Sequence, residues 1–212
     1  MRIISGKFKG HPLISPPGGE KVTRPITDRA KQSLFDNLQD CFAVTDDKGH
    51  AGTVLDCFSG TGSMGLECLS RGAHHAIFIE RDRPALAALK QNLAAMNFTD
   101  RATILPIDAY LLATNPSLLV QPADTQDSGL KTQPSLLTLA FIDPPYSHTD
   151  TGHQRHKIDD LLRSLATHAM VDGGILSFRH PSAVSIDAAA LHVKLLRELR
   201  YGDMTITWLT KA

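Results

Sequence analysis

The chain has 212 residues, 42% of them hydrophobic and 21% charged, which is enough to bury a sizeable core. Basic and acidic side chains number 22 each, so the overall charge excludes neither acidic nor basic partners. No stretch approaches the roughly 20 apolar residues of a membrane span and the start lacks the apolar centre of a signal peptide, so we expect a cytoplasmic protein with no membrane partner.

The first segment of the chain is basic, with seven Lys or Arg side chains among residues 1–31 against two acidic ones. Its opening stretch RIISGKFKGHPLI predicts a short β-hairpin turned at one of its two glycines. Thr27 or Asp28 can cap the helix that follows, because the apolar residues after them share one helical face. We therefore expect an N-terminal unit, residues 1–40, made of a hairpin and a helix, and a larger unit at 41–212.

Strand and helix patterns alternate through the larger unit. Helices are expected from the glycine-rich loop to about Arg71, from a cap at Asp82, and around 157–169. Strands are expected at 53–58, 75–80, 103–108, 136–143 and 174–180, with two antiparallel strands at 195–199 and 204–209. This alternation predicts an α/β, Rossmann-like fold, in which a mostly parallel seven-stranded sheet has helices on both faces.

A glycine-rich loop follows the first of these strands, in VLDCFSGTGSMGLE. Gly60, Gly62 and Gly65 match GxGxxG between a strand and a helix, where the backbone can approach a ligand closely. Glu80 ends the next strand, and a carboxylate there is placed to accept hydrogen bonds from a ribose. Dinucleotides and S-adenosyl-L-methionine both fit this pattern. Asp56, inside the strand before the loop, favours S-adenosylmethionine because it would attract a sulfonium or ammonium group and repel a pyrophosphate.

Asp108 closes the third strand, where it can accept a hydrogen bond from an adenine amino group at the same sheet edge.

The fourth strand ends in Asp-Pro-Pro-Tyr, within FIDPPYSH. The exocyclic amine of a nucleobase is a poor nucleophile, because its lone pair is delocalised into the ring. Asp143 and the Pro144 carbonyl can accept its two N–H bonds, Pro145 stiffens the backbone, and Tyr146 can stack on the base. A rigid turn with a capping Asp is the alternative interpretation. The proton released by methylation can pass to Asp143 or to water.

These motifs together resemble the 16S rRNA guanine-N2-methyltransferases, a family with the class I S-adenosylmethionine-dependent fold. The resemblance rests on RIISGKFKG, TRPITDRAKQSLF, LDCFSGTGSMGLE, DPPY and RYGD, and it covers nearly the whole chain. It implies methylation of the N2 amine of a guanine in 16S rRNA, either free or in a small-subunit particle, by a monomer. By the resemblance the cofactor site comprises Asp56, Phe58, Gly60, Gly62, Glu80, Asp108 and Ala109, the base site Asp143, Pro144, Pro145 and Tyr146, and the RNA grip Lys7, Lys9, Arg24 and Arg29.

Two stretches depart from the family pattern. Residues 113–135, rich in Pro, Ser, Thr and Gln, are predicted to form a long solvated insertion. SFRH at 177–180 replaces an acidic residue that the family usually carries at a strand end, and Arg179 could meet a phosphate instead.

Other functions remain open at this point. A DNA adenine-N6-methyltransferase could share the DPPY and glycine motifs, and a dinucleotide-binding oxidoreductase could share the glycine loop alone. A metal site is not expected, because the His and Asp residues at 148–159 and the three cysteines fit no usual ligand spacing.

Overall fold

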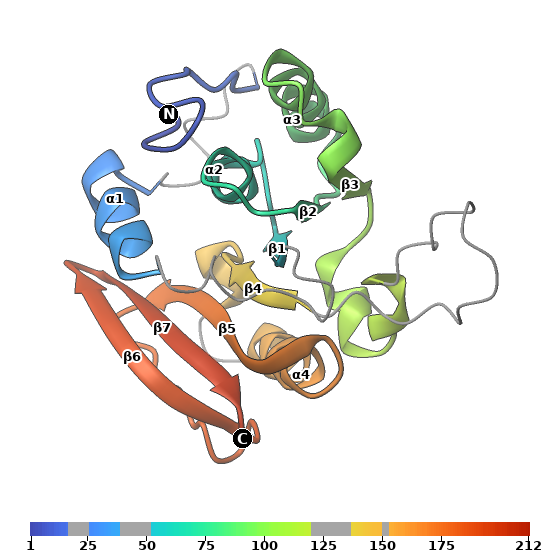
Figure 1. The fold of residues 1–212 in the computed structure, drawn as a ribbon. Helices are drawn as coiled ribbons and strands as arrows, with labels where there is room; N and C mark the ends of the chain where they lie inside the picture. The colour runs from blue at the N-terminus through green and yellow to red at the C-terminus, as the bar shows by residue number, and fades with distance from the viewer. Residues whose placement is uncertain (17–25, 39–51, 120–136, 150–152) are drawn as a thin grey trace.

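A seven-stranded sheet organises the molecule, in the strand order β3-β2-β1-β4-β5-β7-β6 (Figure 1). The computed structural model describes residues 1–16, 26–38, 52–119, 137–149 and 153–212. The strands are β1 (Thr53–Cys57), β2 (His75–Ile79), β3 (Ala102–Leu105), β4 (Leu137–Ile142), β5 (Met170–Pro181), β6 (Val193–Tyr201) and β7 (Met204–Lys211). The first five are parallel, and β7 runs antiparallel to both β5 and β6. The chain order reverses between β1 and β4, the place where open α/β sheets bind ligands.

Helices cover both faces of this sheet (Figure 1). One face packs against α1 (Asp28–Asn37), α2 (Ser63–Ser70) and α3 (Arg83–Ala95). The other face packs against α4 (His153–His168) and the short helices η4 (Ala109–Ala113) and η5 (Pro116–Leu119). Two further short helices are η3 (Thr99–Arg101) and η6 (Tyr146–His148). The mostly parallel sheet with helices on both faces is therefore confirmed. None of the described helices combines the length and the apolar character needed to cross a bilayer.

Local sequence signals explain where two of the helices begin. The Thr27 hydroxyl accepts a hydrogen bond from the Ala30 amide at 3.2 Å and so caps α1. The Asp82 carboxylate accepts one from the Ala85 amide at 3.0 Å and caps α3, whose first turn contains Pro84. Of the two residues proposed as the α1 cap, Thr27 is the one observed.

The N-terminal segment contains less β-structure than the sequence predicts. The expected hairpin is reduced to a single antiparallel bridge, Arg2 to Pro12. Gly6 and Gly10 both have positive φ, so two tight turns take up the residues between them. The segment instead joins α2, because the Lys7 amide donates to the Ser70 carbonyl at 2.8 Å.

The N-terminal segment and α1 share a core with the sheet. Ile3, Leu13 and Phe35 are buried in the same apolar cluster as α2, α3 and Phe141 of β4. Most of the predicted 113–135 insertion lies outside the described residues, and η5 falls within its first part.

Candidate active site

The glycines of the loop between β1 and α2 have separate roles. A Cβ atom on Gly65 would lie 2.4 Å from the Phe78 ring, and one on Gly62 would lie 2.4 Å from Leu89, so both glycines permit close packing. Gly60 has φ +54°, and a Cβ there would meet no atom of the described residues within 4 Å. The backbone at Gly60 therefore faces open space and can be approached by a ligand.

Asp56 is buried beneath this loop, at 3% exposure. Its carboxylate accepts a hydrogen bond from the Gly65 amide at 2.9 Å, in the first turn of α2. The N-cap residue Gly62 has no side chain to do this, so Asp56 supplies the cap from the neighbouring strand. Burial, with a smaller contribution from the negative charge of Asp143, raises the pKa of Asp56 to about 7. A cationic ligand group nearby would favour its charged form.

Glu80, directly after β2, is held by three backbone amides. One carboxylate oxygen accepts from the Gly60 amide at 2.8 Å, and the other accepts from the amides of Arg81 and Asp82, each at 2.8 Å. These bonds fix the carboxylate beside the loop. Both oxygens retain acceptor capacity for the hydroxyls of a ribose.

A buried hydroxyl in the same loop supports the fit of a polar ligand. Ser59 Oγ is buried and has no hydrogen-bond partner within the described part of the chain. Buried polar atoms of this kind are normally satisfied, and a bound ligand is one way to satisfy them. The open side of Gly60, the fixed Glu80 carboxylate and Ser59 Oγ together suit the adenosine and amino acid parts of S-adenosylmethionine.

Asp108 caps η4 and pairs with a neighbour. Its carboxylate accepts from the Tyr110 amide at 3.1 Å and from the Arg81 guanidinium at 2.8 Å. Ala109, the first residue of η4, is buried. The second carboxylate oxygen thus already accepts from the exposed Arg81. An adenine amino group would have to share this oxygen with the arginine or displace it.

Aromatic rings connect the glycine loop with the DPPY motif at this edge of the sheet. Phe58, with φ +63°, meets the Tyr110 ring edge-on at 5.4 Å between centroids. The Tyr110 hydroxyl lies 3.0 Å from Nδ1 of His148, which follows the DPPY motif. Burial raises the pKa of Tyr110 to about 12 and lowers that of His148, so both groups are neutral at pH 7.

The DPPY motif leaves β4 next to the glycine loop. Ile142 pairs with Cys57 in the parallel register, and the Asp143 amide lies 3.5 Å from the Cys57 carbonyl. The Pro145 carbonyl accepts from the His148 amide at 2.8 Å, whereas no described residue donates to the carbonyl of Pro144. The backbone of Tyr146 begins η6, and its side chain lies outside what is described.

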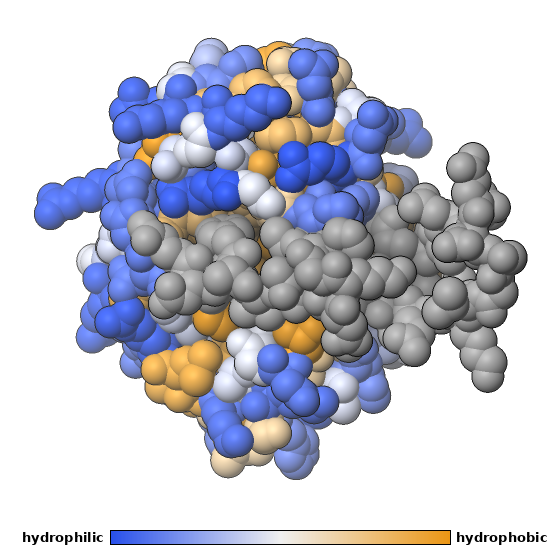
Figure 2. Space-filling model, in the orientation of Figure 1, coloured by the Kyte–Doolittle hydropathy of each residue, from blue (hydrophilic) through white to orange (hydrophobic). Residues whose placement is uncertain are grey.

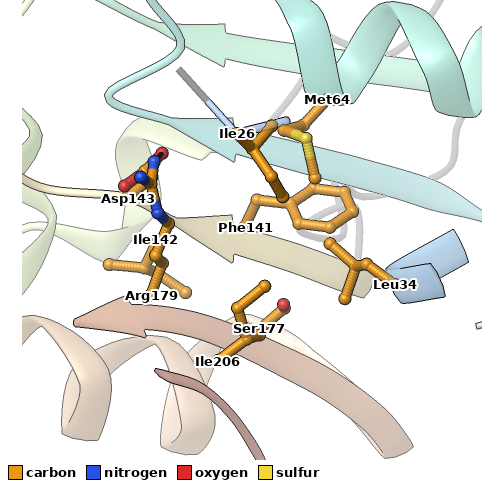
Figure 3. A pocket seen from close by; sticks show the side chains of 9 residues that line it. All are labelled: Ile26, Leu34, Met64, Phe141, Ile142, Asp143, Ser177, Arg179 and Ile206. Atoms are coloured by element: carbon orange, nitrogen blue, oxygen red, sulfur yellow. Dashed lines mark hydrogen bonds and ion pairs between the residues drawn. The ribbon is translucent and has the colours of Figure 1, made fainter. Parts of the chain in front are cut away.

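An arginine accompanies the carboxylate of this motif. The Arg179 guanidinium of β5 donates to one oxygen of Asp143 at 2.7 Å, and no described residue donates to the other oxygen. Figure 3 shows the two side chains together at a pocket whose remaining lining is mostly apolar. Burial raises the pKa of Asp143, and Arg179 opposes this shift. The idea that Arg179 meets a phosphate is not supported by this geometry, since its charge faces Asp143.

The basic N-terminal residues fall into two groups. Lys7, Lys9 and Arg29 are exposed, and strongly hydrophilic side chains lie over the N-terminal segment in Figure 2. Lys31 is instead buried, at 1% exposure. Arg24 lies outside the described residues.

Two functional features were missed in the sequence. Lys31 forms a buried ion pair with Glu67 of α2 at 3.0 Å; its position on the apolar face of α1, in helical spacing with Leu34, was the available signal. The Asp143–Arg179 pair could have been inferred from two charged residues ending strands that become neighbours, once the sheet order was known.

Comparisons with known proteins agree with this arrangement. The family model described as conserved hypothetical protein 95 matches residues 1–210. The chain is 30% identical over 203 residues to the Bacillus subtilis protein named "Putative rRNA methyltransferase YlbH", covering 95% of this chain and 94% of that protein. It is 41% identical over 148 residues to ribosomal RNA small subunit methyltransferase D of Escherichia coli, covering 69% of this chain and 60% of that protein.

A solved structure supports the fold. The Escherichia coli protein titled "Putative methyltransferase yhhF" superposes with a TM-score of 0.71 at 24% identity, over 100% of this chain and 97% of that one. The class I methyltransferase architecture, read from the sheet order and helical layers above, is thereby confirmed. With the family model spanning almost every residue, the chain belongs to the conserved hypothetical protein 95 family of class I methyltransferases that use S-adenosylmethionine.

Proposed function

We propose that this enzyme methylates the exocyclic N2 amine of a guanine in 16S rRNA of the small ribosomal subunit. The observation that carries the proposal is a pair of acceptors at the end of β4. One oxygen of Asp143 and the carbonyl of Pro144 have no hydrogen-bond donor among the described residues. They stand where the strand carrying DPPY leaves the sheet beside the cofactor loop.

Two acceptors are what an aromatic amine requires. Its lone pair is delocalised into the base, and acceptors that pull on both N–H bonds localise that pair on nitrogen. S-adenosylmethionine, when bound, supplies an electrophilic methyl group on a sulfonium. Asp143 and Pro144 then orient the amine, and Tyr146 is proposed to stack on the base. No covalent enzyme intermediate is needed.

The cofactor-binding residues are assigned by their surroundings. Glu80, fixed by three amides, is proposed to accept from the ribose hydroxyls. Asp56 is proposed to attract the cationic amino acid end, and Gly60 and Gly62 to shape the loop around it. Phe58, Asp108 and Ala109 are proposed to border the adenine.

The RNA is proposed to bind along residues 1–40, with 41–212 as the catalytic part. Lys7, Lys9 and Arg29 are exposed and make no ion pair with any described residue, so they remain available for phosphates, and Arg24 is proposed to join them. The names of the relatives support RNA as the substrate: one is an rRNA methyltransferase by name, and another acts by name on the small subunit.

Analysis of labelled nucleosides tests the proposal. The protein is incubated with methyl-labelled S-adenosylmethionine and either unmethylated small-subunit RNA, reconstituted small-subunit particles, or DNA. The expected product is N2-methylguanosine in the RNA or the particle, at one site. N6-methyladenine in DNA would instead identify a DNA methyltransferase, and the absence of label from all three substrates would refute the proposal.

A further inference from the structure

Asp143 and Arg179 meet because of the sheet register. In the parallel pair of β4 and β5, Ile142 lies opposite Phe178. Asp143 directly follows Ile142 at the end of β4, and Arg179 directly follows Phe178 within β5. Arg179 is also held on its other side, where it pairs in register with Ile206 of β7 and its Nε contacts the sulfur of Met204. Its side chain is only 11% exposed. The guanidinium therefore has little freedom to point elsewhere.

The contact divides the Asp143 carboxylate into two unlike oxygens. Oδ2 lies 2.7 Å from a guanidinium nitrogen, a short charge-assisted hydrogen bond. Oδ1 has no donor among the described residues. An immobilised carboxylate with one engaged and one available oxygen is suited to receive a single N–H from a substrate, because its orientation is set before binding.

The other charges around this carboxylate do not replace Arg179. Asp56 on β1 acts on Asp143 with the same negative sign, and Lys31 on α1 exerts its attraction on Asp56. The remaining elements present apolar side chains to the pocket: Leu34 of α1, Met64 of α2 and Ile206 of β7. Burial alone raises the pKa of Asp143, so the carboxylate would tend to hold a proton without the arginine. A protonated carboxyl would accept the amine hydrogen poorly.

We propose that Arg179 is a positioning residue for methyl transfer, which grips one oxygen of Asp143 so that the other stays charged and aimed at the target amine. The inference rests on the proposed role of Asp143. It assigns Arg179 a function through Asp143 and not through contact with RNA.

The test compares Arg179→Met, Arg179→Lys and a matched control, Arg155→Met. Arg155 also pairs with an aspartate, at 2.9 Å on α4, and that aspartate is Asp159 and not a residue of the DPPY motif. Single-turnover methylation of unmethylated small-subunit RNA is measured from pH 5.5 to 9.5, together with KM for RNA and thermal unfolding.

Arg179→Met is expected to move the acidic limb of the rate profile upward by about one pH unit or more, since the pKa of Asp143 then rises unopposed. The rate on this acidic limb falls and recovers at high pH, while KM changes little. Arg179→Lys keeps the charge and retains the wild-type limb, with a lower plateau because the fork geometry is lost. Arg155→Met leaves the profile in place.

A second readout needs neither RNA nor turnover. NMR titration of carboxyl-labelled aspartate, with the Asp143 signal assigned by Asp143→Asn, is expected to give a higher pKa in Arg179→Met than in wild type. An unmoved limb or an unmoved Asp143 pKa overturns the proposal, even if the rate falls. Should Arg179→Met not fold, an Arg179→Lys profile that shifts as far as one pH unit overturns it instead. If wild-type protein fails to methylate RNA, the proposed function fails and the NMR result alone decides on the grip.

Discussion

Two carboxylates of this protein, Glu67 and Asp143, are each paired with a buried or nearly buried cation, but they accept different numbers of hydrogen bonds. Glu67 of α2 accepts four hydrogen bonds, two at each oxygen. Ser5 and Ile4 donate from the backbone at 2.9 and 2.8 Å, and Arg71 and Lys31 donate from side chains at 2.8 and 3.0 Å. Each oxygen of Glu67 therefore already accepts two hydrogen bonds. Through them Glu67 holds the N-terminal segment and α1 against α2, the helix that follows the glycine loop.

Asp143 has one described donor, Arg179. It lies directly after the carboxyl end of β4. Its side chain is 36% exposed, whereas that of Glu67 is 0% exposed. We call the Glu67 pair saturated, because both carboxylate oxygens are fully hydrogen-bonded, and the Asp143 pair half-saturated, because one oxygen has no described donor. The difference indicates that a saturated pair stabilises the fold, while a half-saturated pair has an oxygen available for a substrate. The variants below test that distinction.

Breaking the saturated pair has the largest expected effect. Glu67→Ala leaves the Lys31 ammonium buried without its carboxylate, and two backbone amides lose their acceptor as well. The free energy of unfolding should fall by about 3–5 kcal/mol, as measured by urea denaturation. Asp160→Ala, which breaks the exposed pair with Arg163, serves as the control and should cost about 0–1 kcal/mol. Equal losses in the two variants would contradict the comparison.

The half-saturated pair should instead matter for rate. Asp143→Asn keeps one acceptor but places an amide donor near the target amine, so single-turnover methylation should fall by about 100-fold or more. Cofactor affinity, measured by calorimetry, should stay within about twofold, because the proposed cofactor-binding residues are Glu80 and the glycine loop and not Asp143. Asp159→Asn, at the aspartate of the α4 pair, is the control. A near wild-type rate would reduce Asp143 to a structural cap.

The comparison extends to the basic side chains of the N-terminal segment. Arg2 pairs with Asp28 at 2.9 Å and Lys31 pairs with Glu67, so fewer of these charges are available than the sequence suggests. The remaining prediction concerns the exposed ones, Lys7, Lys9 and Arg29.

Replacing these three with Ala should weaken RNA binding about 10-fold at moderate salt. It should also reduce the steepness of log K against log salt by about 2 to 3, because fewer phosphate contacts form and fewer counterions are released on binding. Arg2→Ala is the control and should leave the slope almost unchanged. Filter binding over a salt series measures both. A triple variant with the wild-type slope would mean that the RNA grip lies elsewhere.

Much of the fold follows from local patterns. The sequence predicted the buried strands, the glycine loop, the Asp82 cap and a cap at Thr27 or Asp28, because each depends on residues close together in sequence. The hairpin at residues 2–14 was overestimated, since its turns and its bonds to Ser70 compete with strand pairing.

The contents of the site were harder to predict. The Asp143–Arg179 pair depends on which strands become neighbours, and that is a property of the whole sheet. Lys31 was counted among the basic side chains of residues 1–31, although its helical spacing with Leu34 and Leu38 placed it on the apolar face. A charge on such a face predicts a buried partner, but the identity of that partner, Glu67, is not encoded nearby.

The smallest expected effect concerns Asp56, a third buried carboxylate that lies between these two extremes. It caps α2 through Gly65, and burial raises its pKa from 3.8 to about 7. Between about pH 4 and 7 the folded state therefore holds a proton that the unfolded state has released, so this group makes the free energy of unfolding fall as pH rises.

Asp56→Asn removes the titration and keeps an acceptor for the Gly65 amide. The difference in Tm, wild type minus variant, should accordingly decrease from pH 4 to pH 7 and level off above it. Because the other titrating groups are the same in both proteins, their contributions cancel in this Tm difference. Cofactor binding gives a second measure, since a cationic group beside Asp56 favours its charged form: wild-type affinity for S-adenosylmethionine should rise several-fold between pH 6 and 8, while that of the variant stays flat. Parallel Tm curves together with equal affinity profiles would show that Asp56 is an already ionised cap that no cationic ligand approaches.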